Sequence, residues 1–159
     1  MRLLSLLCAF LSATAAAAPA VPPDFRITIH DYPGHSEWKA FETTITAEGA
    51  VEQKVLLASG GWRHKRESIP PRAVARLFDT VQQQRFFSLA AEYPTDAEDC
   101  ATFVITVRAN ARSHSVTSAT CFISRGTRAE WNRFFRVWAA ALRAYPSPNK
   151  DQKAEDYER

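Results

Sequence analysis

The sequence predicts an α+β domain in which an antiparallel sheet of five to six strands is covered on one face by two helices. Segments of alternating apolar and polar residues follow one another over 25–69 and again over 101–121. Two other segments, 71–87 and 128–145, repeat apolar residues at helical spacing. Successive strands joined by short turns pair as antiparallel hairpins, so a parallel α/β sheet is disfavoured.

The first part of the chain reads as four strands. Apolar and polar residues alternate at 25–29, 41–45, 51–58 and 62–69, as in strands with one buried face. Between the second and third segments, Gly49 is suited to the positive φ of a hairpin turn. The fourth segment is mostly polar, so we expect it at an edge of the sheet.

Two helices are predicted, one on each side of a second hairpin. The first begins at Pro70-Pro71 and presents apolar residues at the i, i+3, i+4, i+7 spacing, namely Val74, Leu77, Phe78 and Val81. The second begins at a capping box of Thr127 and Glu130 and ends before Pro146. Its apolar face carries Trp131, Phe134, Phe135, Trp138, Leu142 and Tyr145. Both faces are expected to pack on the sheet.

The second hairpin predicts a disulfide. Strands at 101–107 and 113–121 fold about Asn110-Ala111, and this register pairs Phe103 with Ser118 and Cys100 with Cys121. Opposed residues of antiparallel strands lie within the separation that a disulfide tolerates. We therefore predict a structural bridge that stabilises the fold by about 3 kcal/mol. Two free thiols or a metal-binding pair remain alternatives.

The N-terminus resembles a secretory signal peptide. Met1-Arg2 supplies a positive charge, an apolar run follows to Leu11, and alanines dominate the segment up to Ala20. We expect cleavage after Ala17, or else after Ala20, and export to the periplasm or the medium. The apolar run is too short to span a bilayer, so no integral membrane segment is expected in the cleaved protein. Residues 25–145 then form one domain and 146–159 a disordered tail.

Composition excludes several classes of function. The 159 residues carry a net charge of +3, with 46% hydrophobic and 23% charged residues, which is typical of one globular domain and not of a nucleic-acid-binding protein. Only five glycines are present, and no phosphate-binding glycine motif, H-E-x-x-H or C-x-x-C can be written. No catalytic residue, metal or cofactor is therefore assigned, and we expect a monomer.

Several groups of residues are candidates for a site. Those assigned to a binding surface are Trp62, His64, Arg66, Tyr93 and Asp96. Those that could bind a metal or act as acid and base are His30, Asp31, His35 and Glu37, and separately Glu92, Asp96, Glu98 and Asp99. Arginines follow one side of the second helix at 133, 136 and 143, where they form either a solvated face or a docking site for an anionic envelope component.

Several short motifs occur in an order found elsewhere. Ile45, Gly49 and Val51 are followed by the Ile69-Pro70 helix that ends in Phe86-Phe87-Ser88-Leu89, then by Tyr93-Pro94-Thr95-Asp96 and the strand 103–107. This order resembles a family of small secreted bacterial α+β domains of unknown function. A looser similarity is to emfourin-type inhibitors of secreted metalloproteases, in which a Tyr-Pro-Asp turn precedes a terminal hairpin. That similarity implies a protein-binding role.

Together these observations favour an exported, non-enzymatic binding or inhibitor-like module that acts on a protein or an envelope component. The alternative is a small secreted hydrolase that uses the histidine and carboxylate clusters.

Overall fold

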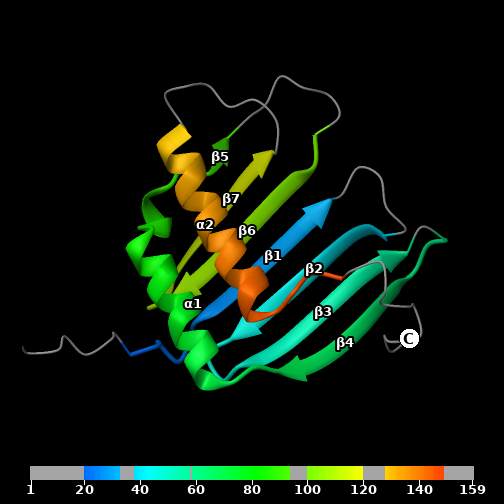
Figure 1. Ribbon diagram of the computed structural model, residues 1–159, viewed down its shortest axis with the longest axis horizontal. Helices are drawn as coiled ribbons and strands as arrows, with labels where there is room; N and C mark the ends of the chain where they lie inside the picture. Colours follow the sequence, from blue (N-terminus) through cyan, green and yellow to red (C-terminus); the bar gives the residue numbers. More distant parts are fainter. Residues whose placement is uncertain (1–19, 33–37, 58, 94–99, 120–127, 149–159) are drawn as a thin grey trace, which may run out of the picture.

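The structure is a computed structural model that describes residues 20–32, 38–57, 59–93, 100–119 and 128–148. Within these residues, a seven-stranded sheet has the order β4-β3-β2-β1-β6-β7-β5. Helices α1 (Pro71–Gln83) and α2 (Arg128–Ala144) both lie on the same face of this sheet (Figure 1). The predicted α+β architecture with two helices is therefore present.

The strands follow the chain in two groups. A meander of four precedes α1, and a short strand and a hairpin separate α1 from α2. Their bounds are β1 Arg26–Tyr32, β2 Trp38–Thr46, β3 Ala50–Leu57, β4 Trp62–Ser68, β5 Glu92–Tyr93, β6 Thr102–Ala109 and β7 Arg112–Ala119. A 3₁₀ turn, η1, spans Phe86–Ser88 after α1.

The prediction of five to six antiparallel strands is wrong. The described residues form seven strands, and β5 pairs with β7 in parallel, with Glu92 opposite Thr117 and Tyr93 opposite Ser118. A strand of two residues is too short to show the alternation that identifies strands in a sequence. Its direction follows from the route of the chain, which leaves the helical layer after η1 and reaches the outer edge of β7.

The register predicted for the second hairpin is confirmed. Phe103 lies opposite Ser118, and the turn residues Asn110 and Ala111 have φ of 53° and 58°, as in a type I′ hairpin turn. The Asp24 carboxylate accepts hydrogen bonds from both turn amides, at 2.9 Å and 2.7 Å. Cys121 lies outside the described residues, as do the proposed signal peptide and residues 149–159, so the disulfide with Cys100 stays a prediction.

The core lies between the sheet and the helices. All four apolar residues predicted for α1 are buried, as are Phe134, Trp138 and Tyr145 in the second predicted stripe. The other members of that stripe, Trp131, Phe135 and Leu142, are half-buried. Helix α2 also buries Val137, Ala140 and Ala141. Both described helices cover one face, and no helix of the described residues lies on the other face of the sheet (Figure 1). None of the described helices is long and apolar enough to span a bilayer.

Candidate functional site

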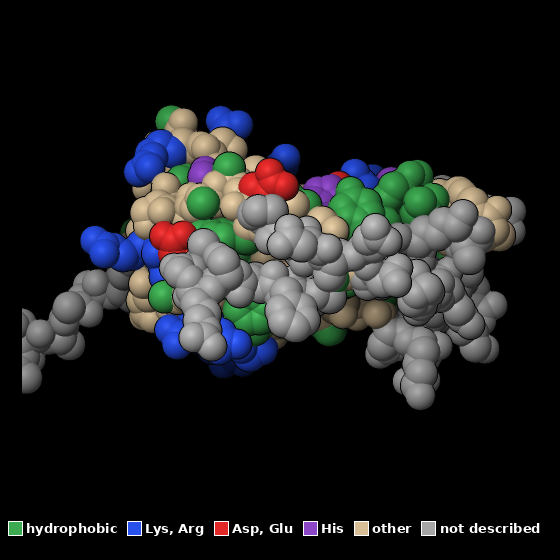
Figure 2. Space-filling model, turned by 90° about the horizontal axis from the view of Figure 1, so that it is seen from above, with side chains coloured by type: hydrophobic (Ala, Val, Ile, Leu, Met, Phe, Trp, Pro, Cys, Tyr) green, Lys and Arg blue, Asp and Glu red, His purple; other side chains and the backbone are tan. Residues whose placement is uncertain are grey.

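The uncovered face of β1–β4 carries the β4 residues that the sequence singled out. Trp62, His64 and Arg66 alternate along β4 and pair with Leu56, Lys54 and Glu52 of β3. Figure 2 shows this face along its upper edge, where histidine side chains lie among acidic, basic and hydrophobic ones. The side chains on this face form the candidate binding surface.

Charged side chains and two histidines cross this face from strand to strand. Glu42 lies between His30 and Lys54, with N···O distances of 3.4 Å and 3.6 Å. Glu52 then contacts Lys54 at 3.7 Å and His64 and Arg66 at 3.6 Å each. These residues form a ladder that spans β1 to β4 and is defined here as the ionic ladder. Its pairs are partly exposed, and such pairs each contribute little to stability.

The charges of the ladder affect the acidity of its central carboxyl. Burial would raise the pKa of Glu52, but the charges of Lys54 and Arg66 and the contact with His64 hold that pKa below its ordinary value. Glu52 therefore stays ionised at neutral pH. The ladder thus presents a fixed alternation of positive and negative charge on the surface.

Two aromatic side chains lie at one end of the ladder. Tyr32 and Trp62 are large hydrophobic residues that are 49% and 46% exposed. Tyr32 ends β1 and Trp62 begins β4, so both lie where β1 and β3 finish. The His30 ring stacks on Tyr32 with centroids 6.4 Å apart and planes 4° apart. Exposed aromatic residues are enriched in protein interfaces.

The other two predicted surface residues are not brought to this face. Tyr93 is only 2% exposed and lies on the helical side, where its hydroxyl donates to Glu130 Oε2 at 2.9 Å and accepts from the Ala90 amide at 3.0 Å. Burial, reinforced by Glu130, raises the pKa of Tyr93 to about 12. Tyr93 therefore anchors β5 to α2. Asp96 lies outside the described residues.

The cluster proposed around His30 is not formed by the residues that are described. His30 and Asp31 are consecutive in β1, and consecutive strand residues point to opposite faces. His35 and Glu37 lie outside the described residues, as do Glu98 and Asp99 from the second cluster. In the part of the chain that is described, no three His, Cys, Asp or Glu side chains gather as a metal site.

Sequence reasoning missed Tyr32, Glu42, Glu52 and Lys54. Each lies on the outward side of a strand. The sequence could have indicated Glu52 and Lys54, because residues two apart in a strand lie on the same face. Their contacts with His30 and His64 depend on the register between different strands, which cannot be predicted from any one segment of the sequence.

No family model matches this chain, and no curated protein is similar to it in sequence. The resemblances to small secreted domains and to emfourin-type inhibitors therefore stay predictions.

Asp31 is an unusual carboxylate on the helical side of the sheet. It pairs in register with Phe41 and Phe103, whose rings contact Trp138 of α2. Its Oδ1 is buried without a hydrogen-bond partner among the described residues. Burial raises the pKa of Asp31 to about 6, so the folded protein holds this proton more tightly than the unfolded chain does.

We expect Asp31→Asn to stabilise the protein at neutral pH. With the pKa raised from 3.8 to about 6 on folding, stability falls as the pH rises through that window and stays lower above it. Because the carboxyl retains partial access to solvent, we expect a gain of about 1 kcal/mol at pH 7.5 and none at pH 4. Urea unfolding at both pH values measures this difference. An equal gain at both would contradict the assignment to the carboxyl charge.

Proposed function

We propose that the protein is an exported, non-enzymatic binding module that recognises a protein partner through the uncovered face of β1–β4. The observation that carries this proposal is the placement of exposed Tyr32 and Trp62 at one end of the ionic ladder. Large aromatic side chains supply most of the affinity in many interfaces. The two rings would be the anchors of the interface.

The ladder supports recognition more than it supports the fold. Partly exposed ion pairs such as those of Glu42 and Glu52 add little stability, whereas an ordered array of charges selects a partner with complementary charges. The edge strand β4 carries Arg63, Lys65 and Arg66, and charges on an edge disfavour the addition of another strand. A partner is therefore expected to bind the face and not the edge.

The geometry supports the hydrolase alternative less well. The described histidine–carboxylate pairs, His30–Glu42 and His64–Glu52, lie on a sheet face in contact with Lys54 or Arg66. Acid–base catalysis needs converging groups in a concave site. The two hollows between α1 and α2 and the one beside Asp24 contain no histidine. An inhibitor-like role remains compatible with the proposal, since an inhibitor is a binding module whose partner is an enzyme.

The test compares two positions of a photo-crosslinking amino acid. Placed at Trp62, the crosslinker should capture a discrete partner from an envelope extract. Placed at Gln82, which is exposed on α1, it should not. Equal yields from the two positions, or no adduct at Trp62, would contradict the proposed surface.

The captured partner then allows a quantitative prediction. We expect Tyr32→Ala combined with Trp62→Ala to weaken binding of that partner by more than about tenfold, because anchors of this type are each worth more than 1 kcal/mol. Isothermal titration with the purified partner measures the change, and Gln82→Ala is the matched control. Unchanged affinity in the double variant would show that the rings do not contact the partner.

A further inference from the structure

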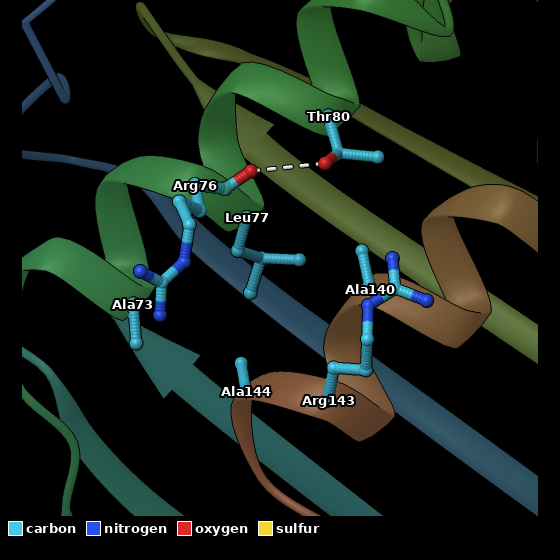
Figure 3. A pocket seen from close by; sticks show the side chains of 7 residues that line it. All are labelled: Ala73, Arg76, Leu77, Thr80, Ala140, Arg143 and Ala144. Atoms are coloured by element: carbon cyan, nitrogen blue, oxygen red, sulfur yellow. Dashed lines mark hydrogen bonds between the residues drawn. The ribbon is translucent and has the colours of Figure 1, made fainter.

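A groove runs between the two helices on the side away from the sheet. One pocket in it has a volume of about 410 Å³, and its lining includes Arg76, Leu77 and Thr80 of α1 and Ala140, Arg143 and Ala144 of α2. Figure 3 shows the two arginines on opposite walls of this pocket. A second hollow, of about 600 Å³, shares Thr80 and Arg143 and extends the groove past Arg136.

The groove is shaped by the size of its side chains. The small side chains of Ala140 and Ala144 line the bottom of the groove on the α2 side, and the arginines lie at its edges. The Thr80 hydroxyl already donates to the Arg76 carbonyl at 2.9 Å, so the guanidinium groups are the main donors that remain for a ligand. Arginine donates paired hydrogen bonds with a geometry that matches phosphate.

The positive charge of this face is not neutralised. In the described part of the chain, no acidic side chain forms an ion pair with Arg76, Arg136 or Arg143. The acidic residues of the two helices are engaged elsewhere: Asp79 accepts from Gln83 at 2.7 Å, and Glu130 accepts from Tyr93. Lysine and arginine side chains accordingly lie at the lower left of Figure 2.

Arg133, which the sequence placed on the same basic side, has a structural task. Its guanidinium donates to the carbonyl oxygens of Gln84 and Arg85 at 2.7 Å and 2.8 Å, and to Ser88 Oγ at 2.8 Å. It therefore satisfies carbonyl groups at the end of α1. The arginines free to bind a ligand are those at the rim of the groove.

We propose that this groove docks the protein on an anionic phospholipid surface, with lipid phosphate groups bound between Arg76 and Arg143. The charge favours a surface over a single small anion, because it continues along both helices through Arg136 and the exposed Arg72. Docked in this way, the protein would direct Tyr32 and Trp62 away from the lipid.

The experiment uses flotation with vesicles and the purified exported protein, from which the predicted signal segment 1–17 has been removed. We expect binding to phosphatidylcholine vesicles that contain phosphatidylglycerol, no binding to pure phosphatidylcholine, and weaker binding as the salt concentration rises. Each arginine near an anionic surface changes partitioning about fivefold. Arg76→Gln combined with Arg143→Gln should therefore weaken vesicle binding by about 25-fold.

The control removes the same charge from the opposite face. Arg66→Gln combined with Arg108→Gln should leave vesicle binding within about twofold of the parent, because these side chains point away from the helices and from a docked membrane. Equal losses in the two double variants would overturn the proposal in favour of a net-charge effect. Binding of inorganic phosphate as tight as that of the vesicles, or preference for polyglutamate over them, would also overturn it. Matching melting temperatures show that all variants are folded.

Discussion

Replacing Trp138 with alanine is expected to lower the free energy of unfolding by about 3–5 kcal/mol. Trp138 is 6% exposed, and its ring lies 4.6 Å from Phe103 and 6.5 Å from Phe41, measured between centroids. It therefore joins α2 to β6 and β2. Truncation removes a large apolar side chain from the core, leaves a cavity and ends the edge-to-face contact with Phe103.

Trp62→Ala is the matched control, because it removes the same side chain from a position that is 46% exposed. Urea unfolding should show a loss below about 1 kcal/mol for that variant, as for most surface substitutions. If Trp138→Ala also lost less than about 1 kcal/mol, the packing of α2 on the sheet described above would be wrong.

Replacing Gly49 with alanine is expected to cost about 2–4 kcal/mol, from two sources. The glycine has a φ of 83°, where a side chain costs about 1–2 kcal/mol. An added Cβ would also collide with the Ile69 carbonyl oxygen. Because that oxygen belongs to the backbone, it cannot rotate away, and the Ile69 amide is itself held to the Gly49 carbonyl at 2.8 Å. The substitution would therefore push the start of α1 away from the β2–β3 turn.

Gly60→Ala separates the two sources. Gly60 has a φ of 85°, but a Cβ there would meet no atom within 4 Å. We expect a cost of about 1 kcal/mol, since the strain at positive φ is partly offset by the lower entropy of the unfolded alanine variant. The difference between the two variants in the loss of unfolding free energy then measures the cost of the contact between the added Cβ and the Ile69 carbonyl oxygen. Equal losses of stability in the two variants would show that the Ile69 backbone moves aside at no cost in free energy.

The candidate surface was predicted only in part. Trp62, His64 and Arg66 could be placed on one strand face from their spacing, but Glu42 and Glu52 could not be joined to them without the register between strands. Tyr93 was assigned to the surface, whereas the structure buries it. Its burial depends on Glu130, which approaches it only after α2 has packed.

Features that depend only on residues close together in the chain could be predicted from the sequence. The apolar stripes of both helices, the turn at Asn110-Ala111 and the positive φ of Gly49 all follow from side-chain spacing or from local backbone conformation. Each of these features can be predicted from one short segment of the chain.

Features that join distant segments could be seen only in the folded protein. β1 lies between β2 and β6, β5 pairs in parallel with β7, and Asp31 faces the core beside Phe41. The basic groove arises because α1 and α2 lie side by side with alanines between them. Such contacts form when the apolar faces of the helices are buried together on one side of the sheet, and that burial is a property of the assembled layers.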